Sequence, residues 1–173
     1  MRVRAYVGLG GNVGGGGAVR AAFLGAAAAL ARVDGVTSVR LSSLWASAPC
    51  GPIAAQPEFS NACVEISLAS CSATALVAEL LAIERAYGRE RAREVPMGPR
   101  TLDLDLLLLG ELVVDDPGPP RAIVPHPRLF QRAFALAPLI ELAGPELVVP
   151  GFGVAGALLV RLGEQQVRRL GPL

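Results

Sequence analysis

The spacing of apolar residues along the chain changes between two periods, and each change predicts a new element. Segments in which apolar and polar residues alternate, or in which β-branched residues predominate, have the pattern of strands. Segments in which apolar residues recur every three or four positions, as Leu76, Leu80 and Ile83 do, have the pattern of helices. The predicted elements are a strand over 2–8, a helix over 18–33, strands over 36–47 and 61–68, a helix over 72–87 and a strand over 101–109.

This order of elements predicts the fold class. Strand, helix, strand, strand, helix, strand is the order of the split βαβ or ferredoxin-like βαββαβ arrangement, in which an antiparallel sheet packs against helices. Beyond it we expect a short hairpin over 111–116 and helices over 133–142 and 154–162. The 173 residues suffice for one substantial core and are too few for two ordinary domains. We therefore expect one α+β domain over 1–173.

Composition and charge argue against several classes of protein. Mean hydropathy is +0.47, yet no apolar stretch approaches the roughly 20 residues of a bilayer span. The first residues lack the features of a signal peptide, so we expect a cytoplasmic protein with no membrane partner. The net charge of +1 gives no field that favours nucleic acid, and we expect a monomer. Three cysteines without CxxC spacing and a single histidine argue against a disulfide framework or a zinc site.

Two carboxylates alternate with leucines in the last predicted strand. Side chains two apart in a strand share a face, so Asp103 and Asp105 project together while the leucines anchor the other face. Magnesium prefers few carboxylates together with water and phosphate oxygens, which suits this pair. The alternative is a solvated strand face. The leucines of 106–109 weaken that alternative, because they indicate a central strand, and carboxylates on the face of a central strand require a specific explanation.

All sixteen basic residues are arginine, which excludes a P-loop lysine. If phosphate is bound, guanidinium groups must clamp it, and several arginines stand just before the two aspartates. The alternative is a solvated charged turn that also contains glutamates. These arginines are Arg89, Arg91, Arg93 and Arg100.

Two other features have weaker signals. The glycine cluster over 10–17 fails the dinucleotide-binding fingerprint, because Val13 stands where the last glycine belongs, and it predicts a flexible turn. His126 lies between Pro125 and Pro127, which hold its direction, although a lone histidine is more often structural than phosphate-binding.

Five segments, taken together, resemble the 6-hydroxymethyl-7,8-dihydropterin pyrophosphokinase family of folate biosynthesis. The resemblance covers nearly the whole chain, to about residue 150. The segments are GPRTLDLDLL at 98–107, GLGGN at 8–12, QPEFSN at 56–61, ERAYGR at 84–89 and VPHPR at 124–128.

The resemblance implies a reaction and a set of site residues. ATP and a pterin alcohol would be the substrates, and the hydroxymethyl oxygen would attack the β-phosphorus of ATP in line, with AMP leaving. Asp103 and Asp105 would bind two magnesium ions, and Arg89 and Arg100 would contact the phosphates as catalytic residues. The ATP site would be completed by Arg121, His126 and Arg132, with Glu84 supporting it. The pterin would contact Ser47, Ala48, Cys50, Phe59, Asn61 and Phe134.

The chain departs from the family pattern at three positions. The family often has serine where Gly11 stands, an aromatic residue near Met97 and a proline near Ala48. The resemblance also implies that segments 48–60 and 89–98 close over bound ATP to exclude water.

Two other functions are alternatives. A nucleotidyltransferase also pairs a glycine turn with a D-x-D motif, but in this chain Gly10 and Gly11 stand some ninety residues before Asp103. A non-catalytic ferredoxin-like binding module would explain the order of elements. It would not explain the acidic strand face or the arginine-rich loop.

Overall fold

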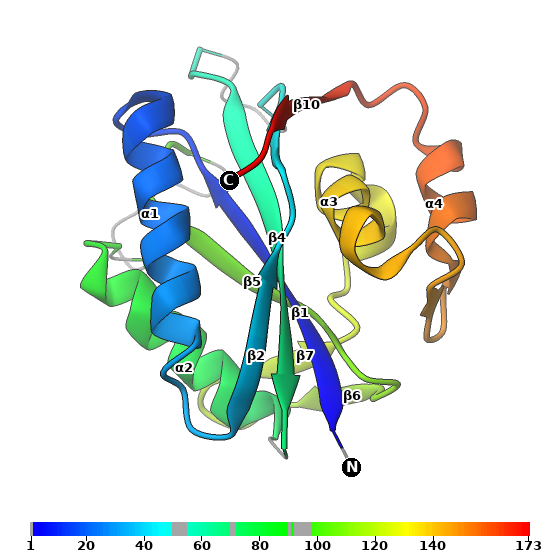
Figure 1. The fold of residues 1–173 in the computed structure, drawn as a ribbon. Helices are drawn as coiled ribbons and strands as arrows, with labels where there is room; N and C mark the ends of the chain where they lie inside the picture. Colours follow the sequence, from blue (N-terminus) through cyan, green and yellow to red (C-terminus); the bar gives the residue numbers. More distant parts are fainter. Residues whose placement is uncertain (1, 50–54, 70–71, 90, 92–97) are drawn as a thin grey trace.

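The computed structural model describes residues 2–49, 55–69, 72–89, 91 and 98–173 (Figure 1). Cys50, Met97 and most of segment 89–98 lie outside the described residues, as do residues 50–54 of the other segment that was expected to close, so this closure stays a prediction. The elements are β1 (Val3–Gly11), α1 (Gly15–Leu30), β2 (Val36–Leu41), β3 (Leu44–Ser47), β4 (Phe59–Leu68), α2 (Ala73–Ala86), β5 (Asp103–Leu109), β6 (Val114–Asp116), β7 (Ala122–Val124), the 3-10 helix η1 (Leu129–Gln131), α3 (Ala133–Ala143), β8 (Val148–Val149), β9 (Gly153–Val154), α4 (Ala155–Arg161) and β10 (Val167–Gly171).

An antiparallel sheet forms the centre of the fold. Its strands run in the order β10-β3-β4-β1-β5, and β2 pairs with the part of β4 that β3 leaves free. Helices α1 and α2 lie on one side of this sheet, whereas α3 and α4 lie on the other (Figure 1). The expected α+β class is therefore confirmed.

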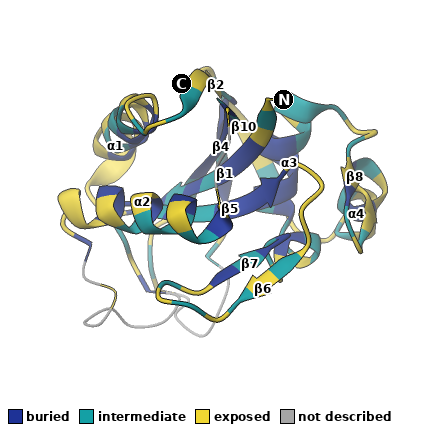
Figure 2. Cartoon of the chain, turned by 90° about the horizontal axis from the view of Figure 1, so that it is seen from below, coloured by how far each residue is buried: buried dark blue, intermediate teal, exposed yellow. Residues whose placement is uncertain are grey.

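Strand alternation divides the core between the two faces of the sheet. On β1, Val7 packs into the cluster that α1 and α2 cover, and the adjacent Tyr6 packs into the cluster beneath α3 and α4. Helix α1 contributes Phe23 and Leu30 to the first cluster, and α3 contributes Leu136 to the second. Figure 2 shows the buried strands of the sheet beside α1 and α2, whose outer faces are exposed. Because helices cover both faces, a polar side chain on the sheet has to be explained by its local surroundings.

The expected strand over 36–47 is two strands, because two serines interrupt the ladder. The Ser42 hydroxyl donates to the Ser43 carbonyl oxygen (2.8 Å) and accepts from the Cys63 backbone N–H (2.8 Å). The Ser43 hydroxyl donates to Oε1 of Glu141 (2.6 Å). Serine side chains that bond the backbone locally compete with regular pairing.

Two other expectations are corrected, and one strand was missed. The expected flexible turn over 10–17 is wrong in part, because β1 continues to Gly11 and α1 begins at Gly15, directly after Gly14 with φ of 88°. The hairpin expected within 111–116 instead joins β6 to β7. Strand β10 was not expected. The predicted helices over 133–142 and 154–162 are confirmed as α3 and α4. In the described part of the chain, no helix combines the length and apolar character needed to span a membrane.

Candidate active site

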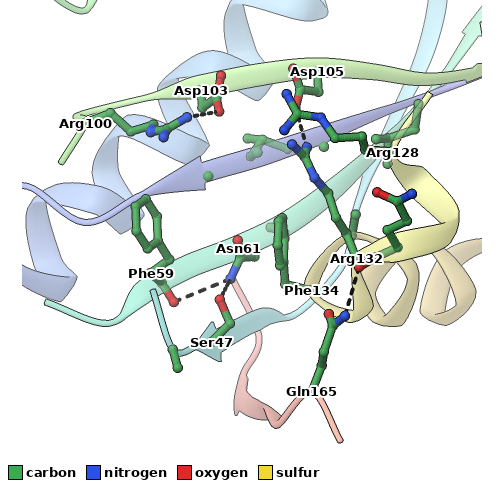
Figure 3. Close-up of a pocket in the computed structure, with 18 of the residues that line it drawn as sticks. Ser47, Phe59, Asn61, Arg100, Asp103, Asp105, Arg128, Arg132, Phe134 and Gln165 are labelled. Atoms are coloured by element: carbon green, nitrogen blue, oxygen red, sulfur yellow. Dashed lines mark hydrogen bonds and ion pairs between the residues drawn. The ribbon is translucent and has the colours of Figure 1, made fainter. Parts of the chain in front are cut away.

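A cavity of about 530 Å³ opens on the side of the sheet that faces α3 (Figure 3). Its walls come from β1, β3, β4, β5 and the start of α3, so the fold gathers residues that are more than a hundred positions apart. Ten of the residues named from the sequence line it. They are Ser47, Ala48, Phe59, Asn61, Arg89, Arg100, Asp103, Asp105, Arg132 and Phe134.

Two glycines of β1 leave space in this cavity because they have no side chain. Gly10 stands between Asn61 of β4 and Asp103 of β5 in the register, and Gly8 stands opposite Asp105. Both glycines line the cavity. A side chain at either position would project into the cavity from the central strand, between its two walls. The glycines therefore serve the site as strand residues and not as a phosphate-binding loop.

One half of the cavity has aromatic and amide groups. Phe59 and Phe134 lie on either side of Asn61 (Figure 3). The Asn61 Nδ2 donates to Ser47 Oγ (2.9 Å) and to the Phe59 carbonyl oxygen (3.4 Å). Because both donors of the amide point into the protein, Oδ1 is the atom that remains to accept from a ligand. This half suits a flat heterocycle with polar N–H groups at its edge.

The other half contains the two aspartates on one face of β5. The side chains of Asp103 and Asp105 are 19% and 29% exposed, while Leu104 and Leu106 point into the core on the opposite face. The predicted alternation is therefore confirmed.

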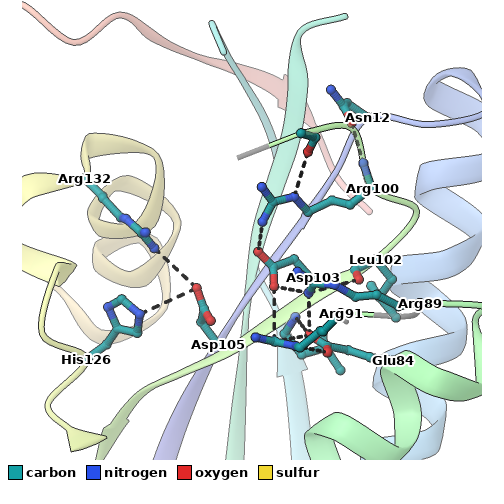
Figure 4. Close-up of polar contacts among 12 residues, drawn as sticks. Asn12, Glu84, Arg89, Arg91, Arg100, Leu102, Asp103, Asp105, His126 and Arg132 are labelled. Carbon is teal, nitrogen blue, oxygen red and sulfur yellow. Dashed lines mark hydrogen bonds and ion pairs between the residues drawn. The ribbon is translucent and has the colours of Figure 1, made fainter. Parts of the chain in front are cut away.

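Three guanidinium groups surround Asp103 (Figure 4). Arg89 contacts its Oδ1, Arg100 Nη1 lies 2.6 Å from Oδ2, and Arg91 Nη2 lies 3.5 Å from Oδ1. Burial raises the pKa of Asp103, but the charges of Arg89 and Arg100 outweigh it and hold the pKa below its ordinary value. Asp103 is thus ionised at neutral pH.

Glu84 of α2 supports this cluster from below the cavity. Its side chain is 1% exposed, and its Oε1 accepts from Arg89 Nη1 (2.7 Å), Arg91 Nη2 (2.7 Å) and the Leu104 backbone N–H (2.7 Å). The last bond holds the backbone between the two aspartates. Glu84 therefore orients both a guanidinium group and the acidic strand.

Asp105 faces a different pair of side chains. Arg132 Nη1 lies 3.3 Å from its Oδ2, and His126 Nε2 lies 3.7 Å from the same atom. Burial, followed by the negative charge of Asp103, raises the pKa of Asp105. The two aspartates therefore differ, since only Asp103 has an excess of positive neighbours.

His126 is neutral in this setting. Burial, followed by the charges of Arg132 and Arg128, lowers its pKa to about 4. Its Nδ1 accepts from the Arg128 backbone N–H (3.1 Å), so the ring proton is on Nε2 and is directed toward Asp105. The 3.7 Å contact is therefore not an ion pair between two charged groups at neutral pH.

Asn12 connects the two halves of the site. Its Oδ1 accepts from the Arg100 backbone N–H (3.0 Å), and its Nδ2 donates to the Pro57 carbonyl oxygen (3.1 Å). Arg100 also lies over the ring of Phe59, 5.5 Å from the centroid. One buried amide thus ties the loop before the aspartates to the strand that bears Phe59.

Comparison with known proteins identifies the family. The family model described as 7,8-dihydro-6-hydroxymethylpterin-pyrophosphokinase (HPPK) matches residues 6–144. The chain belongs to the HPPK family. It is 41% identical over 161 residues to a Synechocystis 2-amino-4-hydroxy-6-hydroxymethyldihydropteridine pyrophosphokinase, covering 93% of this chain and 75% of that protein. It is 42% identical over 152 residues to the Pseudomonas aeruginosa protein of the same name, covering 87% and 86%.

A solved HPPK-DHPS structure in complex with substrates shares the fold. Its TM-score is 0.70 at 11% identity, and the match covers 94% of this chain but 44% of that one. Neither alternative, a nucleotidyltransferase or a non-catalytic binding module, is favoured by these matches. The resemblance seen in the sequence is confirmed.

Not every predicted HPPK site residue lines the cavity. Glu84 lies beneath it and His126 beside it, in contact with Asp105. Arg121 is exposed on the β6–β7 hairpin, where its Nη2 pairs with Asp115 (2.7 Å), so its expected contact with ATP stays a prediction. Cys50 is outside the described residues.

The cavity also contains polar residues that the sequence-based set omitted. Arg128 and Gln131 precede α3, and Gln165 follows α4. Arg128 ends the VPHPR segment, so its position beside His126 was a usable signal. Gln165 has no such signal, because it lies beyond the part of the chain that matches the HPPK model.

Proposed function

We propose that the chain transfers the pyrophosphoryl group of ATP to the hydroxymethyl group of 6-hydroxymethyl-7,8-dihydropterin, forming AMP and the pterin diphosphate for folate biosynthesis. The observation that carries this proposal is one cavity with two chemically different halves. Phe59, Asn61 and Phe134 form an aromatic and amide half, and Asp103 and Asp105 form an acidic half beside arginines. A flat heterocycle and a metal-bound triphosphate require these two environments side by side.

We assign the pterin to the aromatic half. Its ring would stack between Phe59 and Phe134, and Asn61 Oδ1 would accept from an N–H group at the ring edge. Ser47 supports this assignment, because its Oγ fixes the Asn61 amide. Ala48 also lines this half, and Cys50 belongs to the proposed set. Stacking would turn the hydroxymethyl group toward the acidic half.

We assign magnesium ions to Asp103 and Asp105, two in number by the family resemblance. In the described residues no three His, Cys, Asp or Glu side chains gather into a metal-binding group. Two carboxylates that share a strand face and open on a cavity fit magnesium, which takes its remaining ligands from water and phosphate. Bound magnesium would neutralise charge on the ATP phosphates and their leaving group.

The arginines would exchange partners when ATP binds. Arg89 and Arg100 now neutralise Asp103, and a triphosphate would offer them more negative charge at similar distance. Arg132 would likewise turn from Asp105 to a phosphate, and the Nε2 proton of His126 would donate to a phosphate oxygen. Arg121 completes the proposed set. These residues position the reacting groups in line and stabilise developing charge, which is the main requirement of phosphoryl transfer.

We also propose that residues 1–173 form one domain with a ferredoxin-like core. The strand order β5-β1-β4-β2, with α1 after β1 and α2 after β4, supports this topology. A monomeric state, a cytoplasmic location and the lack of a nucleic-acid partner stay predictions.

Formation of AMP from magnesium-ATP, with and without the pterin alcohol, tests the proposed function. AMP should form only with both substrates, and Asp103→Ala or Asp105→Ala should abolish it while circular dichroism stays unchanged. Asp34→Ala is the matched control, since Asp34 is exposed in the turn between α1 and β2. Full turnover in either site variant would refute the metal assignment. Calorimetric titration with magnesium-ATP that gives no heat would refute the ATP site.

A further inference from the structure

We propose that Gln165 is a positioning residue for the pyrophosphokinase reaction and acts through Arg132 and Phe134. The inference rests on the proposed function, which assigns these two residues to phosphate and pterin. Gln165 lies in the connection between α4 and β10, twenty-one residues beyond the end of the family match at 144. The site would therefore depend on a segment that the family pattern does not cover.

The amide of Gln165 holds the junction between η1 and α3. Its Nε2 donates to the Gln131 carbonyl oxygen (2.9 Å), and its Oε1 accepts from the Ala133 backbone N–H (3.0 Å). Arg132, the N-cap of α3, makes no side-chain cap hydrogen bond. Free N–H groups at a helix start need a partner, and here a distant side chain supplies one. The two bonds fix the peptide groups on either side of Arg132.

Both residues beside this junction reach into the cavity. Arg132 Nη1 lies 3.3 Å from Asp105 Oδ2, and its guanidinium carbon lies 5.6 Å from the centre of the Phe134 ring. Figure 3 shows Gln165 beneath this pair, with its amide directed at the junction. A shift of the junction would move the phosphate clamp and the stacking ring together. Gln165 also lines the cavity itself.

The main chain anchors Gln165 from both sides. Its backbone N–H donates to the Leu162 carbonyl oxygen (2.8 Å) at the end of α4. Two residues later Val167 pairs with Ser47 of β3, which lines the same cavity. Gln165 is exposed, and its main chain is held by the sheet on one side and by a helix on the other, so these backbone contacts define where its amide begins.

Replacement of the amide by a chain of similar length isolates this role. Gln165→Met removes both hydrogen bonds, and Gln166→Met is the matched control because Gln166 is exposed and does not line this cavity. For Gln165→Met, kcat/KM for the pterin should fall about 5- to 30-fold, the range for loss of two ordinary hydrogen bonds. The loss should appear mainly in KM. Amide exchange at Ala133 should accelerate at least about tenfold in this variant alone.

A double-mutant cycle separates positioning from a general loss of stability. In the Phe134→Leu background, Gln165→Met should reduce kcat/KM for the pterin by a clearly smaller factor than in the wild type, because the ring is absent and only Arg132 remains to be positioned. An undiminished loss in that background would overturn the inference, as would equal kinetics and equal Ala133 exchange in the two methionine variants. Should Gln165→Met not fold, Gln165→Asn, whose shorter amide cannot reach both partners, replaces it.

Failure of the proposed function gives a different result. A wild-type chain that forms no pterin-dependent AMP would refute that function, whatever the variants do. Ala133 exchange, together with calorimetric binding of magnesium-ATP to the two methionine variants, would then decide whether Gln165 positions the junction.

Discussion

Glu84→Gln gives the sharpest test of how the acidic strand is supported. The substitution keeps the size of a side chain that is 1% exposed and removes its charge. Glu84 now accepts from Arg89, Arg91 and the Leu104 backbone N–H. In the variant one carboxylate oxygen becomes an NH₂ group that cannot accept, and Arg89 stays buried at 6% exposure with less compensation.

The magnitude follows from the cost of breaking a buried ion pair, which is about 3–5 kcal/mol. Asp103 still contacts Arg89 in the variant, so we expect the lower limit, about 3 kcal/mol less free energy of unfolding. A typical domain has a free energy of unfolding of about 5–15 kcal/mol, so the variant should still fold. An uncharged amide also holds Arg89 and the Leu104 N–H less firmly than a carboxylate does. Because Leu104 lies between the two aspartates, a misplacement of about 1 Å there should lower kcat/KM by about 10²-fold.

Urea unfolding and the AMP assay measure these two effects separately. Glu65→Gln is the matched control, because Glu65 is also buried, pairs with Arg40 (3.2 Å) and does not line the cavity. It should lose about 1–2 kcal/mol and keep its activity within about twofold. The reasoning fails if Glu84→Gln unfolds within about 0.5 kcal/mol of the wild type. A stability loss with full activity would leave Glu84 a structural role only.

Three further predictions concern pH, phosphate binding and packing. His126 has a pKa of about 4 in the fold against 6.5 unfolded, so the unfolded chain binds the proton first. The free energy of unfolding should therefore decrease as the pH is lowered from about 6.5 to 4. In His126→Gln, the free energy of unfolding measured with urea should depend less on pH in this range. The same pH dependence in the variant and the wild type would contradict the lowered pKa of His126. Arg128 lines the cavity without an ion pair to the described residues, so Arg128→Gln should raise KM for ATP about tenfold, while exposed Arg161→Gln should not. A Cβ at Gly11 would lie 2.6 Å from the Thr101 carbonyl oxygen. Gly11→Ala should therefore lower the free energy of unfolding, measured with urea, by about 1–3 kcal/mol. A decrease below about 0.5 kcal/mol would contradict the close contact.

The Gly11 contact also explains one departure from the family pattern. The resemblance suggested serine at this position, and any side chain there would press on the backbone that leads into the aspartates. No periodicity in the sequence indicates such a contact. It depends on how closely two strands approach, which is a property of the packed sheet.

Local sequence patterns were sufficient to predict those features of the site that depend only on residues close together in the chain. Alternation placed Asp103 and Asp105 on one face, because successive side chains of any strand point to opposite sides. The lack of lysine assigned phosphate binding to arginine, and a dense set of short motifs was enough to recognise the family. The interruption at Ser42 and the helical start at Gly15 were missed, because serine bonding and glycine conformation depend on the surroundings.

Tertiary structure decided what lies across the cavity. Packing of α3 on the sheet brought Arg132 to Asp105, and pairing of β10 with β3 brought Gln165 to the start of α3. These contacts join residues 27 to 32 positions apart in the sequence, and nothing near one partner in the chain indicates the other. The sequence by itself therefore determined the chemistry of the site and the faces of its strands. Only the fold determined which charges meet and what holds them, because such contacts depend on strand order and helix packing and not on spacing along the chain.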